Sequence, residues 1–99
     1  MVSLTGIELG GLRSAMISYF VDEGRAGRGL ASGAVGELTE RGFTELGLHR
    51  IEAGTALANG ASQRVLEKNR YTKVGLLQRH IRLGGVWTDH YLWERIADD

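Results

Sequence analysis

The sequence predicts a single α/β domain in which helices pack against a mixed sheet. A strand-like run at residues 15–21 leads through a glycine-rich loop into a helical pattern and then into a second strand-like run at residues 49–56. This is the order of a strand–helix–strand unit with parallel strands. Farther on, Gly84-Gly85 joins two strand-like runs within about residues 74–96, which predicts a β-hairpin.

Composition limits the possible classes of function. The chain has 99 residues, 42% of them hydrophobic and 24% charged, which is typical of one small globular domain. Lys and Arg total 12, as do Asp and Glu, so no overall field favours a nucleic-acid partner. There is no cysteine to form a disulfide or a thiolate nucleophile. No apolar run approaches the roughly 20 residues of a membrane span, and the start does not resemble a signal peptide. We therefore expect a cytoplasmic protein without a membrane partner.

The individual elements follow from local patterns. Met1–Ile7 alternates weakly, as an edge strand does, and glycines follow it. Ala15–Val21 carries apolar side chains on both faces, which predicts an interior strand covered on both faces. Apolar residues recur at helical spacing from Leu30 to Leu46, and Gly47 suits the C-terminal cap of that helix. A short helix is expected over residues 60–69, where Asn59 or Ser62 is the candidate N-cap.

The glycine-rich loop, residues 22–31, is a candidate anion site. Glycines let the backbone approach a ligand closely, and the first N–H groups of the following helix have no intrahelical partner. Together these features favour a phosphate or another anion at the start of the helix. Arg25 and Arg28 either add positive charge to that site or are solvated loop residues, and the sequence leaves both readings open.

These motifs together resemble the GNAT-fold N-acetyltransferases, and most closely the ribosomal-protein-alanine N-acetyltransferase branch. Ala26–Ala31 is similar to the acetyl-CoA loop Gln/Arg-x-x-Gly-x-Gly/Ala, although Ala26 replaces Gln or Arg. Asn59–Lys68 is similar to the second signature, an Asn-x-x-Ser helix start that leads to Val-Leu-Glu-Lys. With the Gly-Val-Trp-x-Asp segment of the hairpin, the resemblance covers about Val2 to Ile96. It implies the C-terminal two-thirds of a GNAT acyl-CoA N-acyltransferase fold, in the order β-β-α-β-α-β-β.

The resemblance implies an enzyme that transfers an acetyl group from acetyl-CoA to a primary amine, either a protein N-terminus or a small amine, by direct attack. It implies that Asn59 hydrogen-bonds the pantetheine arm and that Ser62 protonates the departing CoA thiolate; for both residues the alternative is helix capping. In other branches a tyrosine on this helix supplies the proton; this chain has Leu66 at its place, which leaves Ser62 or water as the donor. The remaining residues implied to bind the cofactor are Tyr19, Phe20 and Val21 along the pantetheine arm, and Arg25, Ala26, Gly27, Arg28, Gly29, Leu30 and Ala31 around the pyrophosphate.

The general base must differ from that of the branch. The ribosomal-protein branch commonly has a glutamate where Ile81 aligns, and isoleucine cannot accept a proton. With a two-residue turn at Gly84-Gly85, His80 is expected to face Asp89, whose carboxylate would raise the basicity of the imidazole. The alternative is a cross-strand polar pair that stabilises the hairpin by under about 1 kcal/mol.

The other aromatic and histidine residues are expected to be structural. His49 and His90 are predicted at strand ends or on the surface, and the spacing of the three histidines predicts no metal site. Trp87, Tyr91 and Trp93 share one strand face and are predicted to pack in the core; the alternative for Trp87 is contact with the acceptor.

The resemblance also implies that a strand, two helices and a further strand precede the segment matching this chain, and that those helices form one wall of the acceptor site. We therefore expect residues 1–99 to be a single partial GNAT domain, with a donor-binding unit at about 15–56, a short helix at about 60–69 and a hairpin at about 74–96. The exposed sheet edge near residues 2–7 predicts a homo-oligomer.

Two alternatives to an enzyme follow from the same features. The first is a truncated, non-catalytic CoA-binding or interaction module. The second is a nucleotide binder of the P-loop kind, which is poorly supported because no Gly-Lys-Ser/Thr follows the loop.

Overall fold

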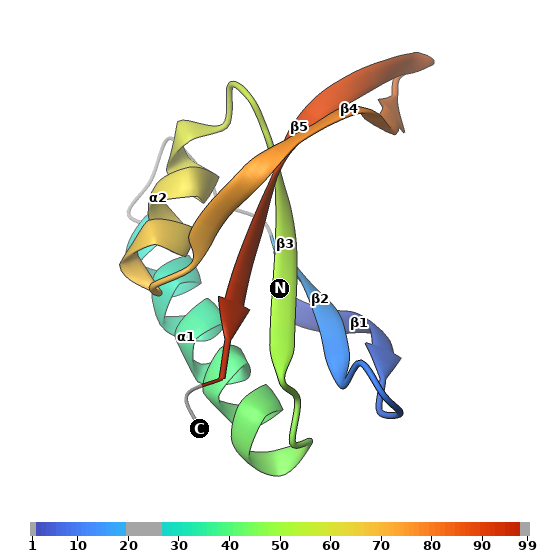
Figure 1. Ribbon diagram of the computed structural model, residues 1–99. Helices are drawn as coiled ribbons and strands as arrows, with labels where there is room; N and C mark the ends of the chain where they lie inside the picture. The colour runs from blue at the N-terminus through green and yellow to red at the C-terminus, as the bar shows by residue number, and fades with distance from the viewer. Residues whose placement is uncertain (1, 20–26, 98–99) are drawn as a thin grey trace.

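The computed structural model describes residues 2–19 and 27–97. Within them the strands form one sheet in the order β1-β2-β3-β5-β4, in which β2 and β3 are parallel and the other neighbours antiparallel (Figure 1). The predicted α/β class and the order β-β-α-β-α-β-β are confirmed. The elements are β1 (Val2–Glu8), β2 (Ser14–Tyr19), α1 (Gly27–Glu45), β3 (Arg50–Ala56), α2 (Gly60–Lys68), β4 (Thr72–Leu83) and β5 (Val86–Ile96).

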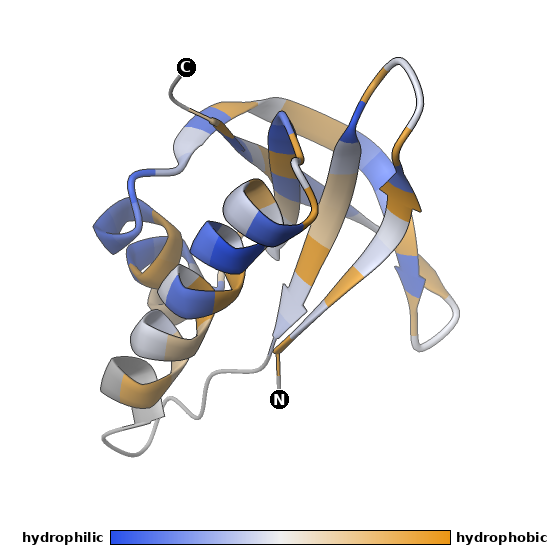
Figure 2. Cartoon of the chain, turned by 90° about the horizontal axis from the view of Figure 1, so that it is seen from below, coloured by the Kyte–Doolittle hydropathy of each residue, from blue (hydrophilic) through white to orange (hydrophobic). Residues whose placement is uncertain are grey.

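Both helices lie on the same face of the sheet (Figures 1 and 2). Buried and more exposed residues alternate along β3, whose Ile51, Ala53 and Thr55 point toward the helices. The core forms between these two layers. Its largest fully buried side chains are Trp93, Ile51, Leu66, Val35, Val65 and Thr39.

β2 is interior in the sheet, as predicted, but the prediction that both of its faces are covered is wrong. Ala15 and Ile17 are buried against the helices, whereas Met16 is half-buried and Ser18 is exposed. The physical reason is that both helices pack on one face, so the described chain places no layer over the other. Apolar residues on both faces of a strand do not reveal which face this chain itself covers.

The turns lie close to their predicted positions. α1 begins at Gly27, within the glycine-rich segment, rather than at Leu30. Gly47 has a φ of +65°, the left-handed conformation of a helix C-terminal glycine. Gly84 and Gly85 have φ values of +56° and +80°, as the tight two-residue hairpin turn requires.

The two edges of the sheet are β1 and β4. The edge position of β1 agrees with the prediction for residues 1–7. The β4–β5 hairpin twists and extends beyond the helices (Figure 1), which leaves the apolar side chains of Leu83 and Val86 near its tip exposed.

Candidate active site

The two parallel strands separate at their carboxyl ends. β2 and β3 are paired at Ser14–Arg50, Ala15–Ile51 and Met16–Glu52, and the described chain gives no strand pairing between them beyond that point. β2 nevertheless continues to Tyr19 and β3 to Ala56. The facing edges of the two strands therefore carry backbone N–H and C=O groups that an extended ligand could bind. We call this place the strand divergence.

α1 starts after β2, as the glycine loop predicted. Its first turn contains Gly27, Arg28, Gly29 and Leu30, and its opening N–H groups have no intrahelical acceptor. Leu30 is exposed, whereas Ala31 is buried in the core and fixes this end of the helix. Phe20, Val21, Arg25 and Ala26, also predicted to bind the cofactor, lie outside the described residues.

The first turn of α2 is anchored to the end of β3. Asn59 is the N-cap, and its side-chain oxygen accepts a hydrogen bond from the backbone N–H of Ser62 at 3.1 Å. The Gln63 side chain donates to the carbonyl oxygens of Ala56 and Leu57, at 3.3 and 3.1 Å. The predicted N-cap is thus confirmed for Asn59, and Ser62 sits in the first turn with its hydroxyl free of the capping role.

Tyr19 connects the end of β2 to the same turn. Its hydroxyl oxygen lies 2.9 Å from Ser62 Oγ and 3.1 Å from the Ser62 carbonyl oxygen. Burial raises the pKa of Tyr19 to about 12, although the hydrogen bond with Ser62 acts in the opposite direction. Asn59, Ser62 and Tyr19, three of the predicted site residues, therefore meet on the helix side of the strand divergence.

His80 was predicted to face Asp89, but the described residues show no contact between its imidazole and the Asp89 carboxylate. The hairpin pairs regularly from Leu83–Val86 to Ile81–Thr88, and then β4 carries three residues, 78–80, opposite the single Asp89 before pairing resumes at Leu77–His90. In this irregularity the Asp89 carboxylate accepts a hydrogen bond from the backbone N–H of Arg79 at 2.8 Å. The regular pairing that the count from the turn assumes ends at Ile81–Thr88, because a bulge follows.

His90, predicted at a strand end or on the surface, is in fact buried within β5, and its ring is the neighbour of the His80 ring. The two rings lie edge to face with their centroids 6.2 Å apart. His90 is 5% exposed and lies on the interior strand β5, between β3 and β4. His49 is exposed just before β3, as predicted.

The aromatic residues of β5 divide between the core and the surface. Trp93 is buried, as predicted, and Tyr91 packs partly buried against the core. Trp87 is 57% exposed, so the prediction that it packs in the core is wrong. It lies next to Val86 at the hairpin turn, beyond the reach of the helices.

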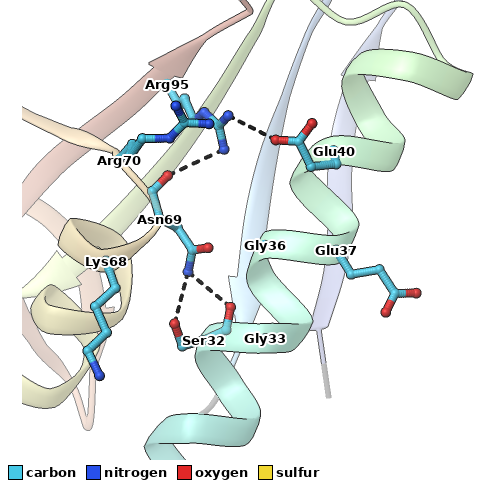
Figure 3. Close-up of a pocket in the computed structure, with 9 residues that line it drawn as sticks. All are labelled: Ser32, Gly33, Gly36, Glu37, Glu40, Lys68, Asn69, Arg70 and Arg95. Carbon is cyan, nitrogen blue, oxygen red and sulfur yellow. Dashed lines mark hydrogen bonds and ion pairs between the residues drawn. The ribbon is translucent and has the colours of Figure 1, made fainter.

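A groove of about 570 Å³ between the helices was not predicted (Figure 3). Asn69 crosses it, with Nδ2 donating to the Ser32 carbonyl oxygen at 3.0 Å, and Arg95 forms an ion pair with Glu40 at 2.9 Å. The only signal in the sequence is the pair of glycines one helical turn apart on α1. The lining residues are Ser32, Gly33, Gly36, Glu37, Glu40, Lys68, Asn69, Arg70 and Arg95.

The family is decided by comparison with known proteins. Residues 1–72 match the model of the acetyltransferase (GNAT) domain. The chain belongs to the GNAT acetyltransferase family. The match includes the start of α1 and the whole of α2, whereas the hairpin from Lys73 onward lies outside it.

Individual relatives agree with this GNAT assignment. The chain is 44% identical over 89 residues to "Probable N-acetyltransferase YjcK" of Bacillus subtilis (strain 168), which covers 90% of the chain and 49% of the relative. The ribosomal-protein-S5-alanine acetyltransferase of Vibrio fischeri superposes with a TM-score of 0.92 at 30% identity, covering 99% of this chain and 54% of that one. Mycobacterium smegmatis RimJ, in complex with CoA-disulfide, gives 0.90 at 36% identity, covering 97% and 46%.

The GNAT chain thus spans about half the length of the relatives that it matches. None of the helices over 27–45 and 60–68 is long and apolar enough to cross a membrane. Among the described residues no group of three or more His, Cys, Asp or Glu side chains could hold a metal ion.

Proposed function

We propose that this GNAT chain binds acetyl-CoA at the strand divergence and transfers the acetyl group to a primary amine. The observation that carries the proposal is the contact of Tyr19 with Ser62 beside the unpaired edges of β2 and β3. It places a polar first turn of a helix over the carboxyl ends of two parallel strands, where α/β proteins bind ligands. Two solved relatives, the ribosomal-protein-S5-alanine acetyltransferase of Vibrio fischeri and the RimJ bound to CoA-disulfide, support this choice of donor.

The proposal assigns the donor to backbone groups. The amides of the pantetheine arm would pair with the free edge of β2, from Ile17 to Tyr19, and continue along Phe20 and Val21. The pyrophosphate would lie at the N-terminus of α1, where N–H groups from Gly27 to Ala31 and the helix dipole favour negative charge. Arg25 and Ala26 belong to the same proposed loop, and Asn59 is the proposed side-chain contact to the pantetheine arm.

In the proposed reaction the amine nitrogen attacks the thioester carbonyl carbon, and the C–S bond breaks with its electron pair on sulfur. Ser62 is the proposed hydrogen-bond donor to the departing sulfur. His80 remains the candidate acceptor of the amine proton, with the ring of His90 beside it in place of the Asp89 carboxylate.

The acceptor would approach from the sheet face opposite the helices, because α1 and α2 cover the other face. Ser18 of β2 and Gly54 of β3 are exposed there, one on each side of the strand divergence. A protein N-terminus and a small amine are both proposed as acceptors. We further propose that the edge strand β1 pairs with a second copy of the chain, which light scattering would test as a mass twice that of the monomer.

The openness of this face favours one alternative, a module that binds CoA without catalysing transfer. Productive amine attack needs an acceptor held in a defined orientation, which confers a large part of the rate enhancement. The described chain offers a bare sheet face in place of a walled site. Binding of acetyl-CoA without turnover on amines and peptide N-termini would favour the module.

Calorimetric titration with acetyl-CoA tests the donor site. The wild-type chain is expected to bind, and Asn59→Ala is expected to weaken binding about tenfold through loss of one hydrogen bond and of the cap. Asn69→Ala is the matched control, because Asn69 ends the same helix at its other terminus. Failure of the wild-type chain to bind acetyl-CoA at millimolar concentration would overturn the proposal.

A further inference from the structure

The hydroxyl of Tyr19 is held between two oxygen atoms of one residue, Ser62. It lies 2.9 Å from Oγ and 3.1 Å from the carbonyl oxygen of Ser62. The backbone N–H of Ser62 is bound by Asn59 at 3.1 Å. Ser62 is therefore fixed at its nitrogen, its carbonyl and its hydroxyl, and the residue is only 7% exposed.

The two hydroxyl groups can change the direction of their hydrogen bonds without moving a heavy atom. In the structure Ser62 Oγ donates to the Tyr19 oxygen, and Tyr19 donates to the Ser62 carbonyl. Each hydroxyl carries one rotatable proton and two lone pairs. If the Tyr19 hydroxyl rotates and donates its hydrogen bond to Ser62 Oγ, the Ser62 hydroxyl keeps its proton and can donate a hydrogen bond to a third atom at the strand divergence.

We propose that Tyr19 is a positioning residue that turns the Ser62 hydroxyl toward the sulfur of bound CoA. The proposal rests on the proposed acetyltransferase function. As the thioester C–S bond breaks, its electron pair goes to sulfur, and the thiolate accepts a hydrogen bond from Ser62 while Tyr19 donates to Ser62 Oγ. The thiolate then takes a proton from water, and neither hydroxyl is consumed.

The state of Tyr19 suits this role. Its pKa is raised to about 12: burial is the largest cause, the hydrogen bond with Ser62 lowers the pKa, and the nearby Tyr71 raises it. A free thiol ionises at about pH 8.5. Tyr19 therefore keeps its proton throughout the pH range in which the CoA thiol becomes a thiolate. The Tyr19 hydroxyl can thus donate a hydrogen bond whenever the CoA thiolate is present.

The competing explanation is that the hydroxyl pair only joins β2 to α2. A second pair of this kind exists in the same core, where Thr39 Oγ1 and the Tyr71 hydroxyl lie 2.7 Å apart. It joins α1 to Tyr71, just after α2, and no hydrogen bond among the described residues links it to Ser62. Tyr71→Phe therefore removes a comparable buried hydroxyl contact and provides a matched control for Tyr19→Phe.

The test is calorimetric binding of CoA and of desulfo-CoA, which lacks the sulfur, at about pH 7 and about pH 9.5, on either side of a typical thiol pKa. For the wild-type chain, the ratio of the affinity for CoA to the affinity for desulfo-CoA is expected to be about tenfold greater at the higher pH. The reason is that a hydrogen bond to a charged group is worth more than one to a neutral group. Tyr19→Phe and Ser62→Ala are each expected to lose this gain, and Tyr71→Phe to keep it.

The double variant Tyr19→Phe/Ser62→Ala separates positioning from independent contact. If Tyr19 acts through Ser62, the double variant loses no more sulfur preference than Ser62→Ala alone. Additive losses, or a Tyr19→Phe variant that keeps the full preference, would overturn the proposal. Equal binding of both ligands by the wild-type chain would reject this inference and leave the donor site intact, whereas binding of neither would reject both.

Discussion

Trp93 Nε1 donates a hydrogen bond of 2.9 Å to Thr55 Oγ1 inside the core. The two residues lie on the adjacent strands β5 and β3, and each is 2% exposed. An indole N–H buried without an acceptor is costly, so the threonine hydroxyl is what allows the largest fully buried side chain to be a tryptophan.

Replacing Thr55 by valine should destabilise the fold. Thr55→Val keeps the shape of the side chain but leaves the Trp93 N–H without its acceptor, so we expect the free energy of unfolding to fall by about 1–3 kcal/mol. Urea denaturation followed by circular dichroism measures it. Thr44→Val is the control, because the Thr44 hydroxyl is also hydrogen-bonded, to the Glu40 carbonyl oxygen, but is exposed. Equal losses in both variants would contradict the explanation.

Arg13 ties the loop between β1 and β2 to the end of α1. Its guanidinium donates to the carbonyl oxygens of Gly47 at 2.8 Å, Leu46 at 3.0 Å and Leu9 at 2.8 Å. A cation at a helix C-terminus also interacts favourably with the helix dipole. We expect Arg13→Ala to lower the free energy of unfolding by about 1–2 kcal/mol.

The loss at Arg13 should exceed that at a simple surface pair. Arg41 forms an exposed ion pair with Glu45 one turn away on α1, and such pairs contribute little. The same urea titration on Arg41→Ala should show almost no change. If the two alanine variants unfold alike, the contacts of Arg13 with the helix end do not stabilise the protein.

Local chemistry explains the part of the fold that the sequence predicts. The helix start at Asn59, the cap at Gly47 and the turn at Gly84-Gly85 each depend on residues within a few positions of one another. Such features follow from periodicity, capping and glycine conformation alone. The order of strands and helices follows from them in turn.

The errors arise where distant parts of the chain meet. The Tyr19–Ser62 contact joins residues 43 positions apart, and no spacing rule brings them together. The pairing of β4 with β5 is interrupted by the bulge at 78–80, so the neighbour of His80 could not be found by counting. Which face of β2 is covered likewise depends on where both helices pack.

Arg70 stands in a left-handed conformation, with a φ of +64°. A residue other than glycine in this conformation costs about 1–2 kcal/mol. Arg70→Gly should therefore raise the free energy of unfolding, by about 0.5–1 kcal/mol after the greater chain entropy of unfolded glycine is subtracted. Thermal and urea unfolding should both shift upward. Lower stability would mean that the Arg70 side chain makes a stabilising contact.

Burial raises the pKa of both Tyr19, to about 12, and Tyr71, above the value of 10.0 for a free tyrosine. The folded state therefore holds these two protons more tightly than the unfolded state does. By linkage, their stabilising contribution is complete below about pH 10, where an unfolded tyrosine begins to ionise, and declines as the pH rises toward the folded-state pKa. We expect the free energy of unfolding to fall across this alkaline range.

Lysine and other groups also titrate there, so the difference between wild type and variant is the decisive quantity. Tyr19→Phe and Tyr71→Phe each remove one ionisable hydroxyl and should make the alkaline decline shallower, while leaving the shape of the curve between about pH 7 and pH 9 unchanged. Urea midpoints measured across both ranges give this comparison. A decline as steep in the variants as in the wild type would mean that neither tyrosine holds its proton more tightly when folded, and that burial does not raise their pKa.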